Sequence, residues 1–407
     1  MKGIFAVQIA IQMTKITSES FENTEKAFIA KSDWQLKKAY WLFKIVNNNT
    51  MARLSTRSAN LALKMHLPVK GMIKNTVFEH FCGGESIEES QETVEMLNKY
   101  GIGAILDYSV EGKHDEAAFD NALKETMRTI ENAKGNKKIP YCVFKPTGMG
   151  SAELMEKIQL GKELNDEEKA AFGRVRERYY KLGQAAYDNN IRLLIDAEDS
   201  WYQNTIDNLL YEMMEKFNKE RAIIFNTYQM YRWASLQNIK DAHARGKEKG
   251  FVLGAKLVRG AYMEIERERA KEKGYEDPIC ADKHATDKSY NDGLKYCIEN
   301  IGEIELFNGS HNEYSNLYLT ELMKKHGLAN DDHRIYFSQL YGMSDNISYV
   351  LGGEGYNVAK YVPYGPIKHV MPYLIRRAEE NTSVAGQSSR ELNLLHKEIL
   401  RRKTVKG

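Results

Sequence analysis

The chain has 407 residues, and 58 basic against 56 acidic residues leave a formal net charge of +2. This near balance of basic and acidic residues argues against a nucleic-acid-binding protein, because such proteins carry a basic excess across a whole domain. The four cysteines lie far apart and form no Cys-x-x-Cys pair, so we expect no zinc site or disulfide framework and a reducing, cytoplasmic compartment. No run approaches the roughly 18 apolar residues of a membrane span.

The first part of the chain is expected to be a helical region covering residues 1–95. Apolar side chains recur there at approximately helical spacing, with many charges between them. Examples are Phe21, Phe28, Trp34, Leu36 and Phe43.

Short apolar runs then alternate with segments long enough for helices. Eight such runs cover residues 103–107, 141–145, 192–196, 222–226, 254–258, 303–307, 334–338 and 357–361. Strands that alternate with helices indicate a parallel sheet, because parallel strands need a crossover connection. Eight units favour a distorted (β/α)8 barrel over residues 96–385, and a doubly wound open sheet is the alternative.

Reactive residues recur at the ends of these runs. Asp107, Lys145 and Asp196 each end a run, and Tyr361 ends the last one. In a barrel these positions share the catalytic face. An aspartate after a strand is also a common helix cap, so the recurrence rather than any single residue indicates a site. Since no histidine lies near the carboxylates after the third run, no metal is expected.

A pair of arginines follows the eighth run. Tyr373, Arg376 or Arg377, and Glu380 lie three or four positions apart and would share one face of a helix. Two guanidinium groups suit a small carboxylate, because each can donate two parallel hydrogen bonds. The alternative is a solvated charged face. The residues alone therefore predict a barrel enzyme acting on a small anion.

Six ordered motifs carry a resemblance to a known family. They are Asp-Ala-Glu at 196–198, the segments 256–262 and 309–312, Gln-Leu-Tyr-Gly-Met at 339–343, and the segments 361–366 and 373–381. With these motifs, residues 95–385 resemble proline dehydrogenase, the flavoenzyme that oxidises L-proline to Δ1-pyrroline-5-carboxylate. The resemblance implies a distorted (β/α)8 barrel holding FAD.

The resemblance also implies the site residues. Arg376 and Arg377 would bind the proline carboxylate with help from Lys145, and Glu111 would pair with Arg376 in the closed site. Asp196 would lie close to the reacting atoms. The ring would be enclosed by Tyr262, Leu340, Tyr361 and Tyr373. The residues matching cofactor-binding positions are Asn226, Lys256, Val258, Gly260, Ala261, Lys283, Ser310, His311, Asn312 and Glu380.

Two of these positions depart from the family pattern. Members often have Arg where this chain has Lys256, and Gln where it has Asn226. Because both replacements keep the charge or the amide, only fine tuning of the flavin is affected.

The family implies further partners. Electrons would pass to a quinone, and a separate Δ1-pyrroline-5-carboxylate dehydrogenase would act next. The C-terminal segment 386–407 reads as an amphipathic basic helix. It would place the protein peripherally on the inner face of the cytoplasmic membrane, unless its leucines cap the barrel instead.

Two other functions remain open at this stage. One is a Schiff-base lyase or aldolase on the same barrel, with Lys145 as the nucleophile. The other is a catalytically inactive barrel that serves as a binding module.

Overall fold

The computed structural model describes residues 16–46, 70–109, 115–374 and 387–406. Four of the expected site residues lie outside these described ranges. They are Glu111, Arg376, Arg377 and Glu380.

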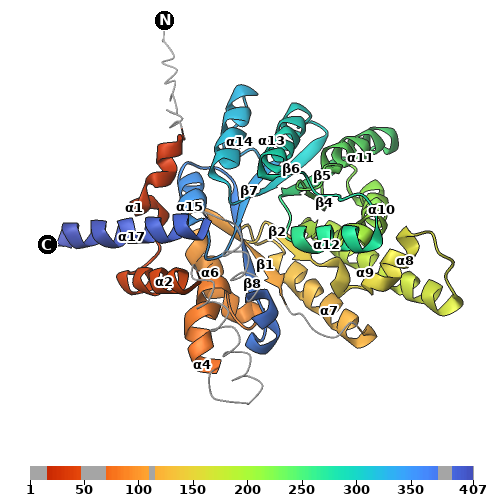
Figure 1. Cartoon of the computed structure of the whole chain (residues 1–407), viewed down its shortest axis with the longest axis horizontal. Helices are drawn as coiled ribbons and strands as arrows, with labels where there is room; N and C mark the ends of the chain where they lie inside the picture. The colour runs from red at the N-terminus through yellow and green to blue at the C-terminus, as the bar shows by residue number, and fades with distance from the viewer. Residues whose placement is uncertain (1–15, 47–69, 110–114, 375–386, 407) are drawn as a thin grey trace, which may run out of the picture.

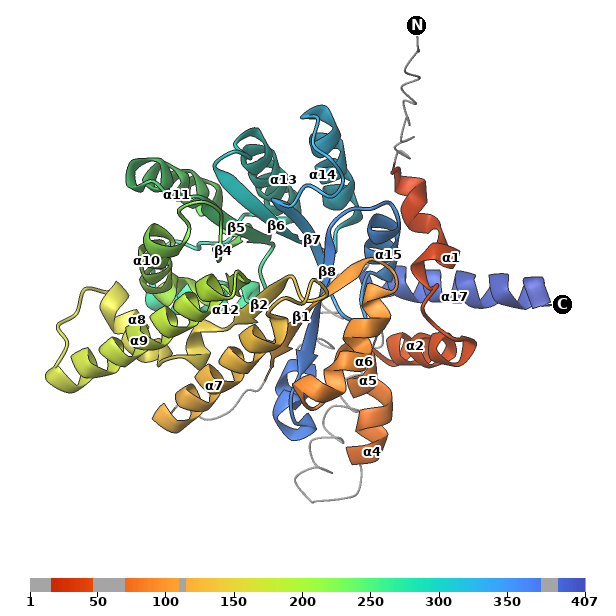
Figure 2. The same cartoon turned by 180° about the vertical axis from the view of Figure 1, so that it is seen from behind.

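Eight parallel strands form one sheet at the centre of the molecule (Figures 1 and 2). Their bounds are β1 (Ile102–Tyr108), β2 (Tyr141–Phe144), β3 (Arg192–Ile195), β4 (Ile224–Gln229), β5 (Leu253–Val258), β6 (Ile304–Gly309), β7 (Ile335–Leu340) and β8 (Val358–Tyr364). The hydrogen-bonded order runs β1-β8-β7-β6-β5-β4-β3-β2, and β2 returns to lie beside β1. This nearly closed order confirms the distorted (β/α)8 barrel and excludes the doubly wound alternative.

Helices surround the strands on the outside (Figure 1). After the strands come α7 (Glu116–Ala133), α8 (Ala152–Gln159), α9 (Asp166–Asp188), α10 (Ser200–Phe217), α11 (Ser235–Lys249), α12 (Met263–Lys273), α13 (Lys283–Glu299), α14 (Glu313–Lys325) and α15 (Asp345–Gly353). Side-chain caps fix several starts. Asp115 accepts the Ala118 amide of α7, and Asn165 and Glu168 form a capping box at α9.

Short helices precede the barrel, and one long helix follows it. They are the 3-10 turn η1 (Ser18–Glu22), α1 (Thr24–Ala27), α2 (Asp33–Val46), α4 (Lys70–Ile73), the π-turn η2 (Lys74–Phe78), α5 (Glu79–Phe81), α6 (Ile87–Asn98) and finally α17 (Gln387–Lys406). Among the residues described, no helix is both long and apolar enough to cross a bilayer.

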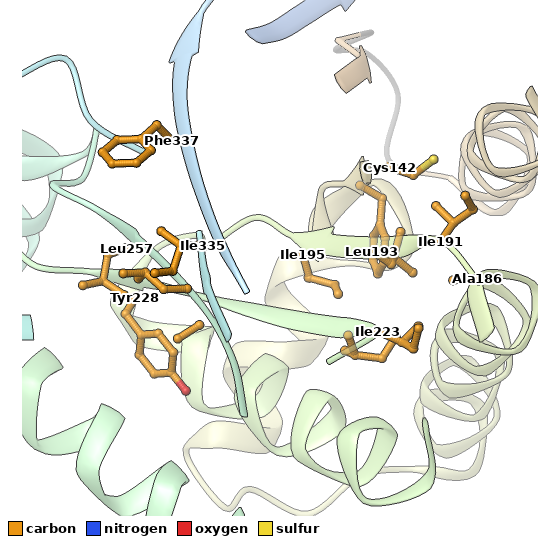
Figure 3. Close-up of a cluster of buried hydrophobic side chains, with 14 of the residues drawn as sticks. Cys142, Ala186, Ile191, Leu193, Ile195, Ile223, Tyr228, Leu257, Ile335 and Phe337 are labelled. Carbon is orange, nitrogen blue, oxygen red and sulfur yellow. The ribbon is translucent and has the colours of Figure 1, made fainter. Parts of the chain in front are cut away.

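Side chains of each strand alternate between the helix layer and the barrel interior. On β3, Leu193 and Ile195 belong to the outer cluster, while Leu194 belongs to the inner one. Figure 3 shows Leu193 and Ile195 with Ile223 in the outer cluster. Members of the inner cluster include Ile105, Tyr141, Val143, Leu194, Phe225, Phe307, Ala359 and Tyr361. The residue that follows an inward side chain by two positions therefore also points inward.

The C-terminal helix packs on the N-terminal helices. Leu394 and Leu395 of α17 are buried in one cluster with Leu36 and Phe43 of α2. Arg402 donates hydrogen bonds to the carbonyl of Phe28 at 3.0 Å, and further bonds to other N-terminal groups. These contacts are those expected if the C-terminal leucines are a structural cap.

Candidate active site

Alternation along the strands brings charged residues together above the inner cluster. Asp107 follows Ile105 by two positions, Lys145 follows Val143, and Asp196 follows Leu194. The Lys145 Nζ lies 2.8 and 2.9 Å from the two oxygens of Asp107 and 3.5 Å from Asp196 Oδ2. Asp107, Lys145 and Asp196, which the sequence places at the ends of three different strands, therefore meet in one charged cluster.

Two more strands complete this cluster. The Lys256 Nζ, on β5, donates to Asp196 Oδ1 at 2.6 Å and to the hydroxyl of Tyr361, on β8, at 2.6 Å. The same ammonium lies 4.6 Å from the centre of the Tyr361 ring. Asp196 therefore sits between two lysines, and the two aspartates and two lysines alternate in charge.

The cluster favours the ionised forms of Asp196 and Lys145. Burial acts to raise the pKa of Asp196, but Lys256 and Lys145 outweigh it, and the pKa lies below the ordinary value. Burial acts to lower the pKa of Lys145, but Asp107 and Asp196 raise it well above the usual range. Lys145 is therefore a cation at neutral pH, suited to holding an anion and poorly suited to nucleophilic attack.

A buried glutamate lies beside this cluster. Glu198 accepts hydrogen bonds from the Thr147 hydroxyl at 2.9 Å and from the Thr147 amide at 3.4 Å. Burial raises the pKa of Glu198 to about 7. This carboxyl can therefore hold or release a proton beside the cavity near neutral pH.

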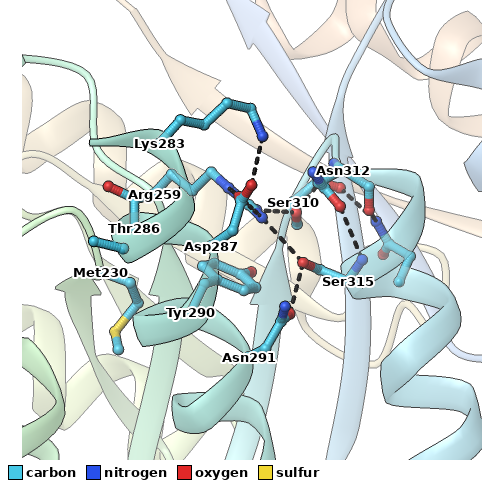
Figure 4. Close-up of polar contacts among 12 residues, drawn as sticks. Met230, Arg259, Lys283, Thr286, Asp287, Tyr290, Asn291, Ser310, Asn312 and Ser315 are labelled. Atoms are coloured by element: carbon cyan, nitrogen blue, oxygen red, sulfur yellow. Dashed lines mark hydrogen bonds and ion pairs between the residues drawn. The ribbon is translucent and has the colours of Figure 1, made fainter. Parts of the chain in front are cut away.

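A second polar network lies at the end of β5 (Figure 4). The Arg259 guanidinium donates to Asp287 Oδ1 at 2.7 and 2.9 Å and to the hydroxyl of Ser310 at 2.9 Å. It also lies over the ring of Tyr290, 4.4 Å from the ring centre. Lys283 reaches the other oxygen of Asp287 and is 74% exposed. Two cations thus share one carboxylate at this end of the site.

Gly260 brings the backbone close to a ring in this region. Its φ is +125°, a conformation that L side chains rarely adopt. A Cβ there would lie 2.6 Å from ring atoms of Tyr231. Only glycine fits this turn, because its lack of a side chain lets the Tyr231 ring pack against the loop backbone.

The turn after β6 supplies three adjacent polar residues. The Ser310 hydroxyl accepts the amide of Asn312 at 3.2 Å, and Asn312 Oδ1 caps α14 by accepting the amide of Ser315 at 2.9 Å. The Nδ1 of His311 lies 2.9 Å from the hydroxyl of Ser344. All three are held by the protein itself.

One cavity of about 650 Å³ joins these groups at the C-terminal strand ends. Most of the described site residues predicted from the sequence line it. They are Lys145, Asp196, Lys256, Val258, Gly260, Ala261, Tyr262, Lys283, Ser310, His311, Asn312, Leu340, Tyr361 and Tyr373. Within the described residues, no cluster of three or more His, Cys, Asp or Glu side chains could hold a metal ion.

Asn226 does not line this cavity. Its amide nitrogen donates to Asp207 of α10 at 3.0 Å, on the outer side of the sheet. The physical reason is alternation along β4: Phe225 belongs to the inner cluster, so Asn226 points outward. Thr227 and Gln229 point inward and line the cavity in its place.

Several residues that received no role from the sequence also belong to the cavity, and among them are three that carry charged or amide groups near the strand ends. Asp107, Glu198 and Gln229 line it. Asp107 and Glu198 are carboxylates at or just after predicted strand ends, so the sequence pattern was sufficient to predict them as cavity residues. Gln229 could not be found, because the strand end was placed too early.

The fold and the charged cavity at its C-terminal strand ends define an enzyme of the (β/α)8 barrel class. The family model for proline dehydrogenase matches residues 90–390. The chain belongs to the proline dehydrogenase family.

Individual relatives agree with this assignment. The carbapenem antibiotics biosynthesis protein CarD of Pectobacterium carotovorum subsp. carotovorum is 35% identical, over 86% of this chain and 91% of its own length. The mitochondrial proline dehydrogenase 1 of Dictyostelium discoideum is 33% identical, over 93% of this chain and 74% of its own length. The crystal structure of proline utilization A from Bdellovibrio bacteriovorus, 20% identical, has a TM-score of 0.75 over 93% of this chain and 43% of its own. The chain thus spans less than half of that longer protein.

Proposed function

We propose that this chain oxidises L-proline to Δ1-pyrroline-5-carboxylate with a bound FAD, as the first step of proline catabolism. The observation that carries the proposal is the cluster of Lys145, Asp196, Lys256 and Tyr361, which lines the same cavity as the Arg259 network. The lysine cluster suits a small anionic substrate, and the Arg259 network suits the phosphates of a dinucleotide.

The cavity fits a group of the size and polarity of FAD. Its volume lies within the roughly 300–1,000 Å³ of small-molecule sites. Arg259 and Lys283 offer two cations against one carboxylate, and both line the cavity. When bound, FAD would supply the hydride acceptor that no side chain provides.

The chain's own residues would bind and orient the substrate. Lys145 would hold the proline carboxylate together with Arg376 and Arg377. Tyr361 and Leu340, which line the cavity beside the inner cluster, would enclose the apolar ring and exclude larger amino acids. Such fixed positioning is what brings a reacting C–H to near-attack distance.

The purified full-length protein should carry non-covalent FAD, and L-proline should bleach its visible absorption. An absorption spectrum before and after anaerobic addition of L-proline measures both. Trans-4-hydroxy-L-proline and a lyase assay without acceptor serve as comparisons. A folded protein that cannot be reconstituted with FAD would refute the proposal. Borohydride trapping of substrate on Lys145 would favour the Schiff-base alternative instead.

We further propose that electrons pass to a membrane quinone and that the protein docks peripherally. Leu394 and Leu395 of α17 are buried in one cluster with α2, so these two leucines are not the docking face while α17 is packed there. The exposed face of α2 is a second candidate for the surface that contacts the membrane. Trp34 and Trp41 lie seven residues apart and are 62% and 58% exposed, with the exposed Lys37 and Lys44 alongside. Tryptophan and lysine together are typical of a membrane interface.

The double variant Trp34→Ser and Trp41→Ser should co-sediment less with anionic vesicles than the wild type. Its activity with a soluble dye acceptor should be unchanged, since both side chains are remote from the cavity residues. Tyr187→Ser, which changes an exposed ring on α9, is the matched control. Equal sedimentation of wild type and double variant would remove α2 from the docking surface.

A further inference from the structure

A glutamate of the C-terminal helix reaches the cavity from outside the barrel. Glu391, on α17, is 5% exposed and lines the cavity. Its Oε1 accepts the backbone N–H of Ser344, in the connection between β7 and α15, through a short hydrogen bond. Figures 1 and 2 show α17 leaving the barrel beside α2, with its first turns near α15. A buried carboxylate thus links a helix beyond the barrel to an active-site loop.

Ser344 has an unusual backbone. Its φ of +51° lies in the left-handed region, where residues other than glycine are uncommon. The bond from its amide to Glu391 holds this conformation. The conformation in turn directs the Ser344 hydroxyl to His311 Nδ1, 2.9 Å away.

The last residue of β7 contacts the second ring nitrogen of His311. The backbone N–H of Leu340 points at His311 Nε2 at 3.4 Å. An amide can only donate, so Nε2 is the acceptor and the proton of the neutral ring resides on Nδ1, where it is donated to the Ser344 oxygen. These two contacts therefore select one tautomer and one orientation of His311.

Buried charges support the loop from below. Lys360, which is fully buried, donates to the carbonyl of Met343 at 2.6 Å and to Asp345 Oδ1 at 2.7 Å. Lys31 lies 3.1 Å from the other oxygen of Asp345. Lys360, Asp345 and Lys31 are the charged groups that act on Glu391, and burial raises the pKa of Glu391 to about 7.

We propose that Glu391 is a positioning residue of the active site, which acts through Ser344 to fix His311 at the cavity wall. The effect of Glu391 on cofactor binding rests on the proposed function. Its effect on the orientation of His311 is argued only from the contacts described above. The C-terminal helix is on this basis a component of the site rather than a cover for the barrel.

FAD affinity tests the first link. Glu391→Ala in the full-length protein should weaken FAD binding roughly tenfold, which is 1.4 kcal/mol, as measured by titration of the apoprotein. Glu391→Gln should largely rescue binding, because its amide oxygen can still accept the Ser344 N–H. Glu398→Ala is the matched control. It removes another buried glutamate of α17 that pairs with Arg401 and Arg402, and it should leave FAD affinity unchanged.

The tautomer of His311 tests the second link without the cofactor. In ¹⁵N-histidine spectra, assigned with His311→Gln, the wild type should show the Nδ1-protonated neutral ring. Ser344→Ala and Glu391→Ala should show a tautomer mixture, while Glu391→Gln and Glu398→Ala should not. If Glu391→Ala fails to fold, Ser344→Ala decides the relay. An unchanged His311 tautomer in the folded variants would overturn the inference. A wild type that binds no FAD would refute only the proposed function.

Discussion

Lys145→Met should lower kcat/KM for L-proline roughly 30- to 1,000-fold, as expected for losing about 2–4 kcal/mol of a desolvated charge-assisted contact. In the structure the Lys145 ammonium is held by Asp107 and Asp196 at the cavity wall. Methionine keeps most of the side-chain volume but leaves both carboxylates with one cation fewer. Part of the loss in kcat/KM will therefore reflect the buried Asp107 carboxylate left without its cation, rather than the lost contact with the substrate. Steady-state kinetics with a dye acceptor measures the effect.

Two controls separate binding from folding in this experiment. Lys157→Met removes a surface lysine paired with Glu168, and such pairs contribute little, so its kinetics should match the wild type. The FAD content of Lys145→Met should also match, since the Arg259 network does not include Lys145. Near-normal proline kinetics in Lys145→Met would contradict its substrate role.

The strands were predictable from the sequence because each has a short, mainly apolar run that is followed by a segment long enough for a helix. All eight predicted runs overlap observed strands, from β1 to β8. Their ends were less certain. On β4 the polar residues Asn226, Thr227 and Gln229 continue the strand, so hydropathy alone gave no reason to extend it. Asn226 was assigned to the cofactor through the family resemblance, whereas in the structure its neighbours Thr227 and Gln229 line the cavity.

The site was predictable to the extent that it follows strand ends. Lys145, Asp196 and Tyr361 each end a run, and alternation places them together. The contribution of Glu391 could not be predicted, because it depends on how α17 packs after the barrel is complete. Likewise the C-terminal leucine stripe has the same period whether it meets a membrane or α2.

Asp345→Asn should reduce the free energy of unfolding by about 3–5 kcal/mol, the usual cost of breaking a buried ion pair. Asp345 is buried between Lys360 and Lys31, and asparagine keeps its shape while leaving two cations without their counter-ion. Denaturant unfolding at pH 7 measures the loss. Lys360→Met is the informative comparison. It removes the fully buried charge and leaves Asp345 paired with Lys31, so it should cost less.

The pH dependence of this difference follows from the pKa of Asp345. Burial acts to raise that pKa, but Lys31 and Lys360 hold it well below its ordinary value. A depressed folded-state pKa means that the unfolded chain binds the proton first as pH falls, so the contribution is complete above roughly pH 4 and is lost below it. The gap between wild type and Asp345→Asn should therefore narrow as the pH falls below about 4. A gap that stays constant down to pH 2, or that is absent at pH 7, would show that the ionised Asp345 does not stabilise the loop beneath His311.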